Sequence, residues 1–286
     1  MICEIQGLPI YYEQYGEGKP VLFIHGWSID HRLMSGSFEP VFEKMQGYKR
    51  IYLDLPGMGK TPSANWIKNS DDTLKILMEF INNIIKDNNF LLAGESYGGY
   101  LSMGLIYKLN NRIDGVFLLC PMIDSRETVD KLGKLPKREI IYCSEEINSQ
   151  KDNEDIKGFL NMAVLATPEI FEVYKKDILS GFDIHDKDFL LKHYKGEYNV
   201  SMEKSLREIT FKKPSCILTG RQDHAVGYSL AYELLERFPR ASFAVLDCAG
   251  HNLQIEDEQT FSQLVRNWIY RVELEEKNSE YNYGNL

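Results

Sequence analysis

Short apolar runs that alternate with helical segments constrain the fold of this 286-residue chain more than any other feature. The helical pattern at 71–86 is the clearest, because Leu74, Leu77 and Ile81 fall on one stripe of an amphipathic helix. The apolar runs suit strands buried on both faces and lie at 21–24, 51–53, 90–93, 115–119, 216–219 and 243–246. Strands that alternate with helices predict an α/β fold with a mostly parallel sheet.

The alternation breaks between residues 122 and 209, where the chain is highly charged and mostly helical in pattern. A segment of this length is too long for a loop in a compact domain, so we expect a structured helical insertion. The core would then consist of residues 1–121 and 210–273. The polar tail at 274–286 is expected to be frayed.

Composition and net charge disfavour some classes of binding partner. The formal net charge is -9, which disfavours binding to nucleic-acid phosphates and to anionic membrane surfaces. We find no basic and apolar leader at the N-terminus and no apolar run of the roughly 20 residues that would span a bilayer. The five cysteines are scattered, as expected for reduced thiols, so we expect a cytoplasmic protein.

A Gly-x-Ser-x-Gly motif formed by Gly94, Ser96 and Gly98 joins the apolar run at 90–93 to a helical pattern at 97–109. A nucleophile elbow occupies this position between a strand and a helix. Its turn is so tight that the residues two before and two after the serine must be small, and both are glycines. We therefore predict that Ser96 is a catalytic nucleophile.

A serine hydroxyl needs an adjacent base that is held in the correct tautomer. His251 follows the run at 243–246 and is the candidate base, and Asp223 follows the run at 216–219 and is the candidate orienting acid. Both lie at the carboxyl ends of expected parallel strands, where α/β sheets assemble their sites. Asp124 is the alternative acid, and His224 is expected to be a neighbour of Asp223 rather than the base.

With these motifs the sequence resembles the α/β-hydrolase superfamily, in the branch of serine hydrolases that carries a helical cap. The matching segments span residues 21 to 251 and are His25-Gly26-Trp27, Asp54-Leu55-Pro56-Gly57-Met58-Gly59, Gly94 to Gly99 and Gly250-His251. The resemblance implies an eight-stranded, mostly parallel sheet with helices on both faces. It also implies a cap inserted after the sixth strand, where the alternation breaks.

The resemblance further implies an oxyanion hole made by the backbone N–H groups of Trp27 and Tyr97, with Gly26 in a supporting position. His25 is expected to tie its loop down rather than to take part in the chemistry. No metal or organic cofactor is implied, and no histidine or cysteine cluster has zinc-ligand spacing.

The activity expected from the motifs and the resemblance is hydrolysis through an acyl-enzyme. A carboxylesterase or thioesterase that acts on a small to medium acyl compound fits best, because a cap favours an enclosed pocket. Two alternatives stay open, a C–C bond hydrolase and a ligand-binding, receptor-like member of the fold with slow turnover. Fold alone does not choose among them.

Two further features are interpreted as structural. Residues 54–61 end like a phosphate-binding loop, but Asp54 replaces its first glycine and Pro62 follows at once, so nucleotide binding is not expected. Glu95 precedes the nucleophile and could tune the site electrostatically, although we expect a solvated or hydrogen-bonded turn residue.

Overall fold

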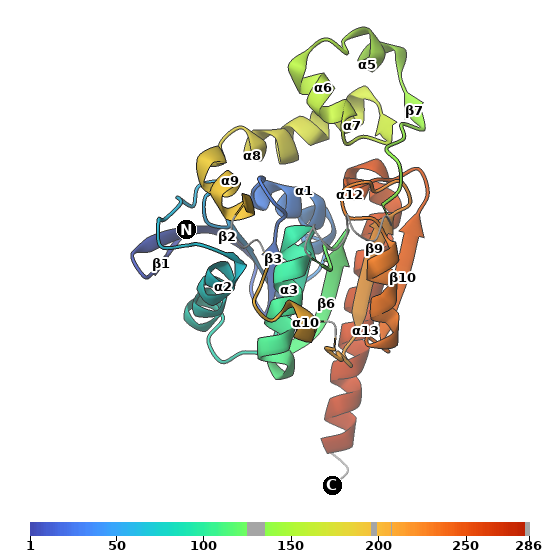
Figure 1. Cartoon of the computed structure of the whole chain (residues 1–286). Helices are drawn as coiled ribbons and strands as arrows, with labels where there is room; N and C mark the ends of the chain where they lie inside the picture. Colours follow the sequence, from blue (N-terminus) through green and yellow to red (C-terminus); the bar gives the residue numbers. More distant parts are fainter. Residues whose placement is uncertain (125–134, 196–198, 207, 284–286) are drawn as a thin grey trace.

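The computed structural model describes residues 1–124, 135–195, 199–206 and 208–283. Its centre is an eight-stranded sheet of order β1-β2-β4-β3-β5-β6-β9-β10 (Figure 1). The strands are β1 (Ile2–Ile5), β2 (Leu8–Tyr15), β3 (Lys19–Ile24), β4 (Tyr48–Leu53), β5 (Phe90–Glu95), β6 (Ile113–Leu119), β9 (Ser215–Gly220) and β10 (Ala241–Leu246).

The sheet is parallel from β4 to β10, while β1 pairs antiparallel with β2 and β2 pairs antiparallel with β4. The predicted eight-stranded, mostly parallel α/β sheet is therefore confirmed. Because the parallel strands end at one edge, the loops that follow β3, β5, β6, β9 and β10 meet there.

Helices cover both faces of the sheet. Along β3, Leu22 and Ile24 pack into the apolar core on one face, and Val21 and Phe23 pack into the core on the other. This alternation follows from the period of two residues in a strand, and it explains the uninterrupted apolar run. The first face is covered by α2 (Ser70–Ile84), α3 (Tyr97–Leu109) and α11 (Ser229–Tyr232), and the second by α1 (His31–Phe42) and α13 (Glu258–Tyr283).

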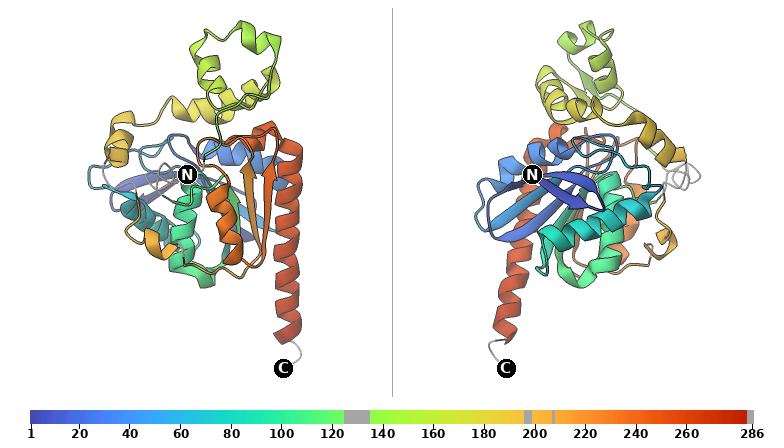
Figure 2. Two further views of the ribbon diagram at one scale, coloured as in Figure 1. Left: turned by 45° about the vertical axis from the view of Figure 1, so that its right-hand side comes forward. Right: turned by 90° about the vertical axis from the view of Figure 1, so that its left-hand side faces the viewer.

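Between β6 and β9, residues 135–195 form helices and a two-stranded sheet beyond the carboxyl ends of the parallel strands, whereas the helix at 203–206 packs against α3 (Figures 1 and 2). The predicted insertion at 122–209 covers this segment, and residues 125–134, 196–198 and 207 of it lie outside the described residues. Its elements are β7 (Tyr142–Cys143), α5 (Glu145–Ser149), α6 (Glu154–Leu160), β8 (Leu165–Ala166), α7 (Pro168–Tyr174), η2 (Lys175–Leu179), α8 (Ser180–Phe182), α9 (Lys187–Lys195) and α10 (Glu203–Leu206).

The C-terminal helix is longer than expected. The core was expected to end at residue 273, but α13 continues to Tyr283 and projects past the sheet (Figure 2). Helix-forming Glu, Leu and Lys residues dominate this stretch, and the first glycine is Gly284. Glu273 accepts a hydrogen bond from the Tyr48 hydroxyl at 2.9 Å, which fastens the helix to β4. Among the described residues, no helix has the length and apolarity to cross a membrane.

Candidate active site

Ser96 lies in the sharp turn between β5 and α3, with φ of 51° and ψ of -115°. A positive φ is uncommon for a residue with a side chain, so the surrounding structure must stabilise it. The Ser96 N–H donates to the Leu119 carbonyl at 3.0 Å, and the Ser96 carbonyl accepts from the N–H groups of Tyr100 at 3.1 Å and Met122 at 3.0 Å. These bonds tie the turn to β6 and to the first turn of α3.

The two glycines of the motif are required by close packing of the backbone. A Cβ at Gly94 would lie 2.4 Å from the Gly98 carbonyl oxygen, and a Cβ at Gly98 would lie 2.1 Å from the Ile24 carbonyl oxygen. Both contacts are with backbone atoms, which cannot rotate away. The tight turn inferred from sequence therefore has a steric reason on each side of Ser96.

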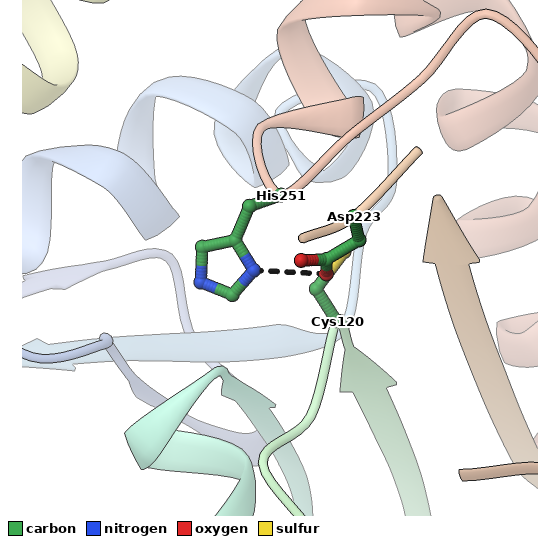
Figure 3. Close-up of side chains that lie close together, drawn as sticks. All are labelled: Cys120, Asp223 and His251. Carbon is green, nitrogen blue, oxygen red and sulfur yellow. Dashed lines mark hydrogen bonds and ion pairs between the residues drawn. The ribbon is translucent and has the colours of Figure 1, made fainter. Parts of the chain in front are cut away.

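The structure brings Ser96, His251 and Asp223 together although they are far apart in the chain. His251 Nε2 lies 3.0 Å from Ser96 Oγ, and His251 Nδ1 lies 2.9 Å from Asp223 Oδ2. The imidazole ring faces the Asp223 carboxylate (Figure 3). The other oxygen of Asp223 accepts from the N–H groups of Ala225 at 2.9 Å and Val226 at 3.1 Å, so the carboxylate is fixed from both sides.

Burial and charge act in opposite directions on this histidine. Burial of His251 disfavours the imidazolium, but the carboxylates of Asp223 and Glu95 outweigh it and raise the pKa of His251 to about 9. Burial also acts on Asp223, yet the His251 charge and the hydrogen bonds to the carboxylate leave the pKa of Asp223 below its usual value. The pair therefore favours an ionised aspartate beside a basic imidazole.

The alternative acid and base have other positions. Asp223, not Asp124, is the aspartate hydrogen-bonded to His251 Nδ1, and Asp124 is buried with contacts of its own. His251, not His224, is the histidine within hydrogen-bond distance of Ser96 Oγ.

Cys120 lies beside this pair at the end of β6 (Figure 3). Its ligating atom and those of Asp223 and His251 lie within 4.8 Å of one another. Burial raises the pKa of the Cys120 thiol well above its ordinary value, so the group is held as a neutral thiol. Metal binding needs a thiolate, and the Asp223 and His251 atoms already bond to each other, so this trio fits a metal poorly.

Glu95 was expected to be a solvated or hydrogen-bonded turn residue, and the structure buries it, which rules out the solvated alternative. It is 1% exposed, and its Oε1 lies 3.3 Å from His251 Nε2, the nitrogen that also faces Ser96. Burial raises the pKa of Glu95 to about 7, although the His251 charge acts to lower it. A Cβ at Gly26 would lie 2.1 Å from Glu95 Oε2, so a glycine at 26 is what lets this carboxyl fit under the loop.

The loop after β3 carries Trp27, one of the two expected oxyanion residues, and the other, Tyr97, is the first residue of α3. His25 Nε2 accepts from the Leu55 N–H at 2.9 Å, and its Nδ1 donates to the Gly26 carbonyl at 2.7 Å. Burial lowers the pKa of His25, so its ring is neutral, and its bond to the Leu55 N–H joins this loop to the one after β4. The Trp27 ring packs edge-on against the Tyr97 ring with centroids 4.9 Å apart, which places the two residues side by side.

The loop formed by residues 54–61 is held together by hydrogen bonds to the Asp54 carboxylate. Asp54 Oδ2 accepts from the Lys60 N–H at 2.8 Å, and Oδ1 accepts from the His31 N–H at 2.9 Å. The aspartate that replaces the first glycine therefore holds the loop together, where a phosphate-binding loop would leave its N–H groups for a ligand.

Sequence reasoning missed Glu256. Its carboxylate accepts from the N–H of Gly250, next to His251, at 2.6 Å and from the N–H of Val164, in the segment between β6 and β9, at 2.6 Å. One buried side chain thus fastens the histidine loop to that segment. A glutamate at the end of a short helix, here α12 (Leu253–Glu256), carries no sequence signal for such a role.

The amino-acid sequence is similar to those of known hydrolases. A family model described as serine aminopeptidase, S33, matches residues 19–258. The 2-hydroxy-6-oxononadienedioate/2-hydroxy-6-oxononatrienedioate hydrolase of Escherichia coli K12 is 26% identical over 283 residues, which covers 92% of this chain and 92% of that protein.

Solved structures are similar over nearly the whole chain. The α/β superfamily hydrolase from Oenococcus oeni PSU-1 is 32% identical with a TM-score of 0.84, over 92% of this chain and 96% of that one. An esterase from Exiguobacterium antarcticum has a TM-score of 0.70 at 19% identity, over 94% of this chain and 98% of that one, and at this identity the likeness shows the fold alone.

Proposed function

This chain belongs to the α/β-hydrolase superfamily, through the family described as serine aminopeptidase S33, and on that premise we propose that it is a serine hydrolase acting through an acyl-enzyme. The membership confirms the resemblance drawn from the sequence motifs. Within it, the proposed activity is that of a carboxylesterase or thioesterase on a small to medium acyl compound.

The observation that carries the proposal is the position of His251 between Ser96 and Asp223, 3.0 Å from the first and 2.9 Å from the second. Ser96 Oγ attacks the ester carbonyl carbon while His251 Nε2 takes its proton, and Asp223 stabilises the imidazolium. His251 then gives that proton to the leaving oxygen or sulfur as the acyl bond breaks. Water activated by the same nitrogen releases the acid and restores Ser96.

The oxyanion of each step would accept hydrogen bonds from the backbone N–H groups of Trp27 and Tyr97. Tyr97 follows the nucleophile at the N-terminus of α3, where N–H groups point outward. The packing of Trp27 on Tyr97 and the anchoring of the loop by His25 support a preformed arrangement. Donors already oriented at the developing charge stabilise the transition state without reorganisation.

C–C bond hydrolysis is the second candidate. The Escherichia coli relative is named for a hydroxy-oxo-dioate substrate whose name contains no ester, so its hydrolysis must break a different bond. The same serine, histidine and aspartate could serve either substrate class.

Hydrolysis of p-nitrophenyl esters from acetyl to dodecanoyl, by wild-type protein and by Ser96→Ala, tests the proposal. We expect turnover that peaks at short or medium acyl length and is lost in Ser96→Ala. Ser37→Ala is the control, because the buried Ser37 donates its hydroxyl to the Leu33 carbonyl in α1, away from the site.

Equal rates in wild-type and Ser96→Ala protein would reject Ser96 as the nucleophile. Wild-type turnover confined to 2-hydroxy-6-oxononadienedioate would favour the second candidate. Saturable ligand binding without turnover of either compound class would favour the receptor-like alternative.

A further inference from the structure

A cavity of about 370 Å³ lies between α9 and the loop that precedes α2. Its wall is formed by residues 64, 65 and 67–69 on one side and by Phe189, Lys192 and His193 of α9 on the other. Neither Ser96 nor His251 lines it, so it is a separate space from the candidate triad. A cavity of this size holds a small organic group.

His193 is the unusual wall residue. Its side chain is buried, with the whole residue 4% exposed, yet neither ring nitrogen has a hydrogen-bond partner among the described residues. The ring packs instead against the rings of Trp27 and Phe189, with centroids 5.6 Å and 5.7 Å away. A buried polar group without a partner is costly, so it points to a partner that the protein alone does not supply.

The imidazole can both donate and accept a hydrogen bond. Burial lowers the pKa of His193 to about 4, against a small opposing effect of Asp72, so the ring is neutral at neutral pH. A neutral ring carries one N–H donor and one acceptor nitrogen. The donor fits a carboxylate oxygen, and the ring itself brings no charge to hold that anion.

Two lysines in the cavity wall supply the positive charge that an anion would need. The charged wall residues are Lys68 and Lys192, both exposed, although the chain as a whole has 42 acidic and 33 basic residues. The nearby carboxylate of Asp72 accepts from the Lys68 N–H at 2.9 Å and pairs with Lys75 at 3.0 Å, so its charge is already compensated. The cavity wall therefore offers an imidazole and the ammonium groups of Lys192 and Lys68, of which Lys68 also donates to the Asn65 carbonyl.

Ring contacts of Trp27 link the wall of the cavity to the candidate active site. The Trp27 ring contacts His193 on one side and the Tyr97 ring on the other, and Tyr97 directly follows Ser96. A group bound against His193 would lie next to Trp27, whose backbone N–H is a proposed oxyanion donor. Such a group would belong to a part of the substrate remote from the reacting carbonyl.

From this geometry we infer that the cavity is a subsite for a carboxylate at the far end of the substrate's acyl chain, with His193 as its inner hydrogen-bond donor and Lys68 and Lys192 as its counter-charges. This inference rests on the proposed function, because it assigns that activity to half-esters and half-thioesters of dicarboxylic acids. His193 would be a specificity-determining residue and not a catalytic one.

The first test compares p-nitrophenyl hexanoate with mono-p-nitrophenyl adipate, which has the same chain length and a terminal carboxylate. In His193→Phe we expect the ratio of kcat/KM for adipate to that for hexanoate to fall by roughly tenfold, the size of one lost hydrogen bond to a charged group. The loss should appear in KM for adipate, and kcat/KM for hexanoate on the same variant corrects for any change that does not involve the carboxylate. Lys192→Gln should lower the same ratio, and Lys187→Gln, an exposed lysine of α9 outside the cavity wall, should not.

The second test measures adipate binding to Ser96→Ala protein by calorimetry, with and without His193→Gln, and needs no turnover. Loss of adipate binding in the double variant, with an unchanged circular dichroism spectrum, supports the subsite even if no ester is hydrolysed. An unchanged kcat/KM ratio in His193→Phe, or adipate binding that is indifferent to His193, overturns it while the ester series still stands. Failure of the proposed function is recognised separately, by ester turnover that survives in Ser96→Ala.

Discussion

Glu95→Gln isolates the effect of the second carboxylate beside the candidate base. The substitution keeps the shape of the side chain and removes a charge that lies 3.3 Å from His251 Nε2. His251 must be neutral to accept the Ser96 proton, and its pKa is raised to about 9, so activity should rise with pH through that region. Because the pKa of Glu95 is about 7, its carboxylate is ionised where His251 titrates.

Coulomb's law gives the size of the expected change. Two unit charges 3.3 Å apart interact by about 1 kcal/mol at the dielectric constant of water and by about 5 kcal/mol at an effective value of 20. The smaller figure corresponds to about one pH unit. In Glu95→Gln the acid limb of kcat/KM against pH should therefore shift from near pH 9 to near pH 8 or lower.

The pH dependence of the free energy of unfolding provides a second, independent test. The folded protein holds the Glu95 proton to about pH 7, whereas the unfolded chain loses it near 4.5. The folded state therefore binds more protons between these values, and wild-type stability should fall as pH rises from 4.5 to 7, by on the order of 3 kcal/mol. Glu95→Gln should remove that decline. It should also shorten the further decline that stems from the raised pKa of His251, which ends near pH 9 in the wild type and near pH 8 or lower in the variant.

The assays are ester hydrolysis from pH 5 to 10 and urea unfolding over the same range. Glu154→Gln is the matched control, because the Glu154 side chain is 84% exposed and lies in α6, far from the triad in sequence. An acid limb that stays in place, or that shifts upward in Glu95→Gln, would refute the electrostatic reasoning. An unchanged slope of stability between pH 4.5 and 7 would refute the raised pKa of Glu95.

Two further substitutions test the geometry of the site. Asp223→Asn should lower kcat by about 10³- to 10⁴-fold with little change in KM, because the amide holds the histidine in the wrong tautomer, as in the serine-protease triad. An effect below tenfold in single-turnover kinetics would argue against the orienting role of Asp223. Gly98→Ala should destabilise the fold by about 1–3 kcal/mol or more and lower Tm, since its Cβ would lie 2.1 Å from the Ile24 carbonyl oxygen. Gly158→Ala has no atom within 4 Å of its Cβ and is the control, so equal Tm values for the two variants would contradict the packing argument.

Much of the fold could be predicted from local patterns. Strands buried on both faces read as apolar runs, as at β3 and β5, and the elbow around Ser96 reads as glycines at fixed spacing, because both depend on neighbours in sequence. The positions of Asp223 and His251 followed from one topological rule, that parallel strands end at a common edge. These features could therefore be predicted from the sequence alone.

Other properties depended on contacts between distant residues. Whether Glu95 is solvated, whether α13 ends near residue 273, and what Glu256 bonds to are settled by burial and packing across the whole chain. His193 is an ordinary helical residue in sequence and becomes distinctive only because Trp27 and Phe189 enclose it without offering a hydrogen bond. The sequence determined the strands, the turn and the order of the reactive groups, whereas their desolvation, and hence their charge, was decided by the tertiary structure, because desolvation arises from all the atoms that surround a group.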